Sequence, residues 1–126
     1  MEEQPRYLVG IDLGTTNSAL SYVDTHADPG AMPVRLMSIP QLTSRGFVEG
    51  KHTLPSFCYL LLSGEWTPGD IELPWGARAS YAVGELAKEQ GALVPTRIVS
   101  SAKSWLCNAV ADRTDRILPT AAEEHK

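Results

Sequence analysis

The residues best suited to chemistry follow an apolar run near the N-terminus. Residues 7–18 read Tyr-Leu-Val-Gly-Ile-Asp-Leu-Gly-Thr-Thr-Asn-Ser, so a strand pattern leads into a turn of small, hydroxyl-bearing residues. Gly14 permits a tight turn and lets a ligand approach the backbone amides closely. The amides and hydroxyls that follow could surround an anion, as successive N–H groups do in anion-binding nests. They belong to Thr15, Thr16, Asn17 and Ser18.

Asp12 stands just before this turn and adds a carboxylate at the end of the strand. A carboxylate beside a phosphate-binding turn is a suitable ligand for hydrated Mg²⁺. The chain has neither the glycine-lysine loop of Walker-type ATPases nor the Gly-x-Gly-x-x-Gly fingerprint of dinucleotide-binding folds. A plain β-hairpin with Gly14–Asn17 as its turn is the alternative interpretation. The pattern favours a phosphate and magnesium site.

The string from Asp12 to Ser18 resembles the first phosphate loop of the Hsp70 chaperone ATPases. These proteins belong to a superfamily that also contains actin and sugar kinases. Sugar kinases share the Asp-x-Gly-Thr core but usually carry a basic residue soon after the serine, where this chain has Ala-Leu-Ser. Bacterial actin-like filament proteins resemble the loop too. A sugar-kinase-like phosphotransferase and an actin-like filament or nucleotide-sensing scaffold are therefore the alternatives to an Hsp70-like protein.

A second segment, Gly84–Lys103, resembles the Hsp70 stretch in which a Gly-x-x-Ala-Lys-x-Gln helix runs through Pro-Thr into a helix that bears the catalytic lysine. Residues 53–56, Thr-Leu-Pro-Ser, are similar to the family's Thr-Thr-Pro-Ser. The family usually has Arg and then Leu-Ile-Gly after the lysine, whereas this chain has Ser-Trp-Leu-Cys. The resemblance spans residues 7–107 and indicates a divergent member of the Hsp70 (DnaK-like) family.

Lys103 lies four residues after Val99 and three before Leu106, so helical spacing puts it at the border of an apolar stripe. Spacing alone favours a lysine whose stem covers the core edge while its ammonium reaches water. The resemblance instead implies a catalytic lysine that points into the nucleotide cleft, stabilises charge on the γ-phosphate and positions the attacking water. It further implies that Asp12 assists catalysis by holding Mg²⁺, and that ATP or ADP phosphates bind at Gly14, Thr15, Thr16 and Asn17.

Length and composition limit the function classes. The chain has 126 residues, 43% hydrophobic and 21% charged, with a net charge of −4, which is typical of one modest globular domain. This acidic balance gives no support for nucleic-acid binding, and no apolar run approaches the roughly 20 residues of a membrane helix. The two cysteines, Cys58 and Cys107, indicate neither a disulfide framework nor a zinc site. We expect a cytoplasmic protein.

The pattern of apolar and polar residues predicts an α/β fold. The resemblance implies that this fold is a partial actin-like ATPase (ribonuclease H-like) lobe. A mixed sheet would begin with a three-stranded meander over Tyr7–Leu13, Ser18–Val23 and Val34–Ile39, the first strand being buried on both faces. Residues 41–55 are predicted to form an exposed loop. A buried strand at Ser56–Leu62 and a turn-rich insertion at Gly64–Trp75 would follow, with Trp66 and Trp75 packed against the core rather than stacked on a base.

A small peripheral α/β subdomain is expected to complete the fold. Tyr81–Val83 is predicted as a short strand before a helix over Glu85–Gln90, with one helix over Ala77–Gln90 as the alternative. Thr96 is a plausible N-cap for a further helix. That helix would carry an apolar stripe of Ile98, Val99, Ala102, Trp105 and Leu106.

The sequence contains no second phosphate loop of the type Asp-Leu-Gly-Gly-Gly-Thr. An adenosine pocket and a peptide-binding domain are not recognised either. We therefore expect residues 1–111 to be the N-terminal portion of an Hsp70-like nucleotide-binding domain, and residues 112–126 to be a polar tail. Such a portion would contribute to ATP hydrolysis without being competent alone. The resemblance implies ATP or ADP and Mg²⁺ as cofactors, and unfolded peptide clients and co-chaperones as partners of the parent protein.

Overall fold

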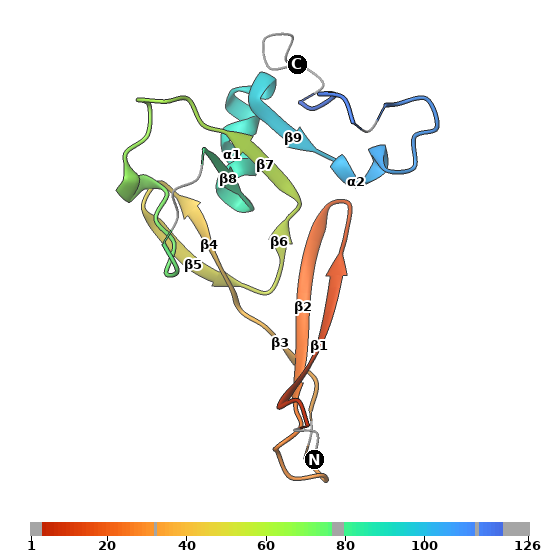
Figure 1. Ribbon diagram of the computed structural model, residues 1–126. Helices are drawn as coiled ribbons and strands as arrows, with labels where there is room; N and C mark the ends of the chain where they lie inside the picture. The colour runs from red at the N-terminus through yellow and green to blue at the C-terminus, as the bar shows by residue number, and fades with distance from the viewer. Residues whose placement is uncertain (1–3, 32, 77–79, 113, 120–126) are drawn as a thin grey trace.

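The computed structural model describes residues 4–31, 33–76, 80–112 and 114–119. The fold is mixed α/β and is built mostly from short strands with few helices. One long β-hairpin extends away from a small body in which strands surround a helix (Figure 1). Every strand pairing among the described residues is antiparallel, so the expected mixed sheet is not observed there.

The long hairpin consists of β1 (Tyr7–Leu13) and β2 (Asn17–Asp24), which pair along their whole length. The predicted strands at these positions are confirmed. β3 (Arg35–Leu36) pairs with β2 and completes the predicted meander, although it is shorter than expected. β6 (Leu54–Pro55) pairs with the start of β2 beside the hairpin turn. The meander is therefore anchored to the body close to the turn.

β1 is not the buried central strand that its sequence indicates. All seven of its residues are exposed, including Ile11 at 64% and Leu13 at 66%. Among the described residues β1 pairs only with β2, which leaves its other edge open. A continuous apolar strand is typical of a sheet covered on both faces. The side chains of β1 are thus suited to a burial that the described residues do not provide.

Residues 41–55 contain strands where a loop was expected, so that prediction is wrong. β4 (Ile39–Ser44) and β5 (Phe47–Lys51) form a second hairpin, with Gly46 in its turn at a φ of +73°. Pro40 lies within β4. The polar residues of this segment are typical of an exposed loop. Gln41 is nevertheless buried, and both the Oε1 and the Nε2 atom of its amide form hydrogen bonds. Its Nε2 donates to the Thr53 carbonyl (2.8 Å).

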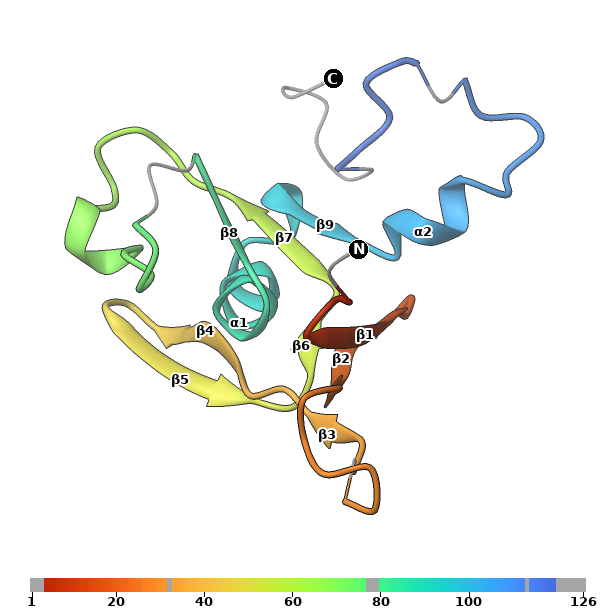
Figure 2. The same cartoon turned by 60° about the horizontal axis from the view of Figure 1, so that its bottom comes forward.

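A three-stranded sheet forms the centre of the body. β7 (Phe57–Leu60) pairs with β8 (Tyr81–Val83) on one side and β9 (Ile98–Ser100) on the other. α1 (Glu85–Leu93) lies between this sheet and the β4–β5 hairpin (Figure 2). The prediction of a strand followed by a helix is confirmed, and one helix through Tyr81–Val83 is wrong. The buried apolar residues are Leu42, Tyr59, Ala82, Leu86 and Ala87.

Gly91 determines how closely α1 approaches β9. A Cβ added at Gly91 would collide with the Ile98 side chain, and Gly91 itself is buried. Glycine in a helix interior costs about 0.5–1 kcal/mol relative to alanine. Close packing of the helix on the strand offsets that cost here.

The predicted amphipathic helix after Thr96 is wrong. Pro95–Arg97 forms a short 3₁₀ helix, the next three residues form β9, and only α2 (Ala102–Trp105) is helical. Ile98 and Val99 are β-branched, which favours a strand, and they pair with Tyr59 and Cys58 of β7. Their apolar spacing fits a helix and a buried strand equally well, and pairing with β7 decides for the strand.

The segment between β7 and β8 is irregular, as predicted, with a 3₁₀ helix at Pro68–Asp70. Trp66 packs against the core cluster, and its ring lies 6.5 Å from that of Tyr59. The Arg45 guanidinium stacks 3.7 Å from the Trp66 ring centroid. The expected packing role of Trp66 is confirmed, whereas Trp75 is 64% exposed.

The predicted polar tail is only partly described. Residues 112 and 114–119 contain neither helix nor strand, and residues 120–126 lie outside the described part of the chain. Within the described residues, no helix has the length and apolar character needed to cross a membrane.

Candidate phosphate-binding site

The turn of the long hairpin lies beside α2 and the start of β7 (Figure 1). Residues 14–16 form this turn between β1 and β2. A Cβ added at Gly14 would collide with the carbonyl oxygen of Asn17, so the backbone folds closely on itself here. The tight turn that the sequence predicts at Gly14 is therefore confirmed, and it requires glycine.

The carbonyl groups of the turn are held by the body of the protein. Ser56 donates from its hydroxyl to the Gly14 carbonyl (2.8 Å) and from its amide to the Thr16 carbonyl (2.8 Å). In contrast, the amides of Thr15 and Thr16 donate no hydrogen bond within the described residues, and both residues are exposed. The turn therefore has bonded carbonyls and available amides, which is the arrangement that an anion-binding turn requires.

Lys103 reaches this turn from the far end of the described chain. Its Nζ donates to the Leu13 carbonyl at 2.7 Å, across a sequence separation of 90 residues. The helix predicted around Lys103 is much shorter than expected, yet the residue lies beside the predicted loop. An ammonium group has three donors. One bond to Leu13 leaves donors for an anion bound at the turn.

Asp12 is exposed near the end of β1, opposite Ala19 of β2. It lines an open depression of about 350 Å³ together with Gly10, Ser21 and Leu36. No cluster of three or more His, Cys, Asp or Glu side chains that could hold a metal occurs among the described residues. Mg²⁺ commonly binds one or two protein carboxylates and completes its shell with water and substrate phosphates. The lining of the depression includes no residue of the turn, and Asp12 lies near the turn only in sequence, two residues before Gly14. By its chemistry, Asp12 is the residue that would hold the ion.

Ser18 has a different role from the one expected. The sequence placed its hydroxyl among the anion ligands, but Ser18 lies on β2 and its Oγ is 3.2 Å from the Ser56 Oγ. Ser56, which was not a predicted site residue, supports the turn through three contacts in all. The similarity of residues 53–56 to the Hsp70 Thr-Thr-Pro-Ser string was the available signal. The two serines position the turn, and the amides of residues 15–16 remain for the ligand.

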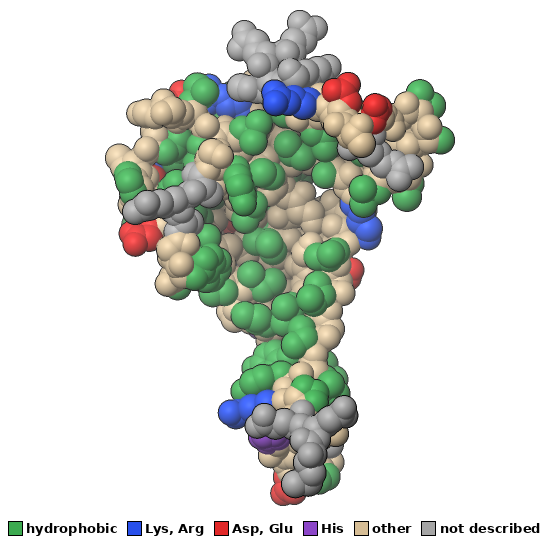
Figure 3. Space-filling view, in the orientation of Figure 1, with side chains coloured by type: hydrophobic (Ala, Val, Ile, Leu, Met, Phe, Trp, Pro, Cys, Tyr) green, Lys and Arg blue, Asp and Glu red, His purple; other side chains and the backbone are tan. Residues whose placement is uncertain are grey.

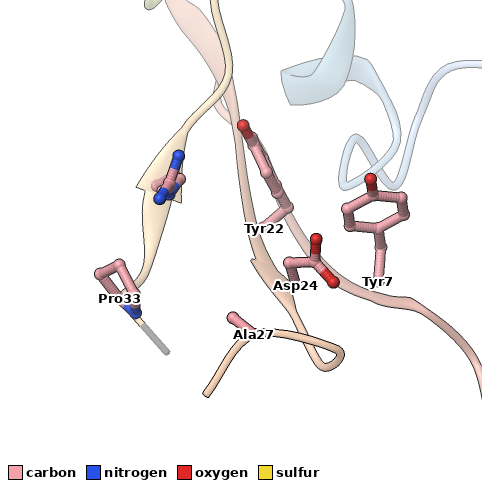
Figure 4. Close-up of a pocket in the computed structure, with 6 residues that line it drawn as sticks. Tyr7, Tyr22, Asp24, Ala27 and Pro33 are labelled. Carbon is pink, nitrogen blue, oxygen red and sulfur yellow. The ribbon is translucent and has the colours of Figure 1, made fainter. Parts of the chain in front are cut away.

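A second pocket lies at the opposite end of the hairpin and is separate from the turn. Figure 4 shows Tyr7 and Tyr22 on either side of Asp24, with Pro33 across an opening of about 240 Å³. A hydrogen bond from the His26 amide and contact with Arg6 (3.3 Å) lower the pKa of the Asp24 carboxyl. These contacts fix the end of the hairpin, and none of them reaches the turn at residues 14–16.

Comparison with known proteins adds no further constraint: no model of a known protein family matches the chain, and no solved structure matches it significantly.

Proposed function

We propose that this chain supplies one side of the ATP site of a divergent Hsp70-like chaperone ATPase. The observation that carries the proposal is the hydrogen bond from Lys103 Nζ to the Leu13 carbonyl. Two segments that separately resemble Hsp70 sequences meet there, next to amides that have no partner within the described residues. A plain hairpin turn does not account for this meeting.

The proposed roles follow from the chemistry of each group. Amides of Thr15 and Thr16 bind phosphate oxygens, and Asn17 extends the same surface. Asp12 holds Mg²⁺, which neutralises phosphate charge when bound. Lys103 supplies a positive charge where negative charge develops during phosphoryl transfer, a preorganised group that lowers the barrier.

We propose that a second protein surface completes the ATP site, opposite the turn. β1 is apolar, exposed on both faces and open along one edge, as expected of a strand inside a larger sheet. Figure 3 shows hydrophobic side chains along this hairpin on the face that it draws. We assign residues 1–111 to part of an actin-like ATPase (ribonuclease H-like) lobe on this basis. Peptide clients, co-chaperones and a cytoplasmic location are proposed from the family resemblance.

Calorimetric titration of the chain with Mg-ATP, combined with a turnover assay, tests the half-site. We expect affinity weaker than micromolar and no measurable hydrolysis, because only one side of the cleft contacts the nucleotide. Titration with Mg²⁺ alone is the control for binding at acidic surface groups. Micromolar affinity with turnover by this chain alone would contradict the proposal, and ATP-dependent polymerisation would favour an actin-like filament subunit instead.

A further inference from the structure

An apolar groove of about 260 Å³ lies on the body of the protein, and none of the turn residues 14–16 lines it. β4 and β8 form two of its walls, and the segment before β8 forms the third. Of the side chains in its lining, only Gln41 carries an amide or a charge. Both ends of that amide are used, since Oε1 accepts from the Glu85 amide (3.2 Å) and Nε2 donates to Thr53. Prominent lining residues are Ile39, Leu54, Ile71, Leu73, Trp75 and Tyr81.

β8 has an open edge beside this groove. The Leu61 amide donates to the Ser80 carbonyl (2.9 Å) and the Gly84 amide to the Phe57 carbonyl (3.2 Å), which fixes the phase of the β7–β8 ladder. Hydrogen-bonded pairs alternate along an antiparallel ladder. Ala82 therefore directs its N–H and C=O toward β7. The N–H and C=O groups of Tyr81 and Val83 point the other way, and no strand among the described residues pairs with them.

These features point to one kind of occupant. Two outward N–H groups and two outward C=O groups at strand spacing match the backbone of another strand. The groove offers no charged side chain for a small polar metabolite. β8 lacks lysine, proline and a bulge, which often protect an exposed edge, and its short length limits pairing to a short segment. A three-residue edge is too short to supply the roughly 1,000 Å² of a stable interface between two folded copies, and it suits the weak, transient docking of a short segment.

We propose that the β8 edge docks an extended, uncharged apolar segment of a partner protein. The segment adds as a strand beside Tyr81–Val83 and places alternate side chains in the groove. The exposed ring of Trp75, at 64%, forms the rim that closes over one of these side chains. None of the proposed ATP-site residues, Asp12, Gly14–Asn17 and Lys103, lines this docking site.

The test is fluorescence polarisation with a labelled peptide of alternating valine and threonine, flanked by lysines for solubility. Two modified versions of this peptide, the N-methylated twins, have the same sequence. One twin carries backbone N-methyl groups on its odd-numbered residues and the other on its even-numbered residues. We expect one twin to bind about tenfold more weakly and the other to bind normally, because only alternate amides of an added strand face β8. An apolar surface that merely attracts hydrophobic peptides would not separate the twins.

Matched variants locate the site on the protein. Val83→Pro removes an amide that points away from β7, a position where edge strands tolerate proline, and should weaken binding about tenfold. Ser100→Pro makes the same change on the outer edge of β9 and should leave affinity within about twofold. Trp75→Ala, a change at an exposed residue that the fold tolerates, should weaken binding at least about threefold through lost apolar contact.

Circular dichroism confirms that each variant is folded. The proposal is overturned if both N-methylated twins bind equally, or if Ser100→Pro weakens binding as much as Val83→Pro. A concentration-dependent dimer that Val83→Pro abolishes would overturn it in favour of a second copy of this chain. Binding of an apolar dye in the groove with no binding of the unmodified peptide would overturn it in favour of a small apolar ligand.

Discussion

Replacing Lys103 with alanine is expected to lower ATP hydrolysis about 10²–10³-fold in a two-lobed ATPase that carries this segment. The ammonium of Lys103 lies next to the turn, as its 2.7 Å bond to the Leu13 carbonyl shows. It would stabilise charge that develops mainly in the transition state, so its loss reduces kcat rather than affinity. Single-turnover hydrolysis and equilibrium binding of Mg-ATP, measured on the same preparation, separate the two effects.

Lys88 provides the matched control for this change. It is an exposed lysine on α1, and Lys88→Ala should leave both measurements unchanged. Normal hydrolysis in Lys103→Ala would contradict the catalytic assignment. Lys103 would then be a surface lysine that only secures the Leu13 carbonyl.

Leu86→Ala is expected to destabilise the fold by about 2–5 kcal/mol, the usual cost of truncating a buried leucine. Leu86 is 1% exposed and packs with Leu42 and Ala82 where α1, β4 and β8 meet. Small domains are commonly stable by only about 5–15 kcal/mol, so this loss is a large part of the total. Urea denaturation followed by circular dichroism measures the change in the free energy of unfolding.

Leu93 is the corresponding control on the same helix. Its side chain is 74% exposed, so Leu93→Ala should change the free energy of unfolding by no more than about 0.5 kcal/mol. Equal effects of the two substitutions would mean that α1 does not pack against β4 and β8 as described. The two substitutions remove the same atoms, so burial alone distinguishes them.

Local features of the fold were predictable from the sequence. The bounds of β1, the tight turn at Gly14 and the break between β8 and α1 at Gly84 are all confirmed. In each case the deciding information lies within a few residues. Gly84, for example, has a φ of +78°, a conformation that separates strand from helix and that glycine adopts readily.

Features that depend on distant partners were not predictable. Ile98 and Val99 fit a helical stripe, and only pairing with β7 makes them a strand. The sequence around Gln41 is typical of a polar loop. The hydrogen bonds that allow its amide to be buried involve Thr53 and Glu85, which lie far from it in the sequence. The exposure of β1 could not be predicted from its residue types, because an apolar run of this kind is typical of a strand that is buried inside a larger sheet.

The candidate site was predictable only in part, and for different reasons. The available amides and Asp12 follow from a short string of residue types near the N-terminus. The place of Lys103 followed from the family resemblance, because the helix inferred from spacing is largely absent. Ser56 supports the turn through hydrogen bonds that span 38 and 42 residues, which no local pattern specifies.

The central claim is that the turn at residues 14–17 binds nucleotide phosphate beside Lys103. Amide NMR of ¹⁵N-labelled protein titrated with Mg-ATP tests it most directly, with adenosine as the control lacking phosphate. We predict millimolar, saturable shifts in the amides of Thr15, Thr16 and Asn17 that adenosine does not reproduce and that Lys103→Ala weakens. Unperturbed turn amides, or shifts centred instead on the pocket of Tyr7 and Tyr22, would contradict the account.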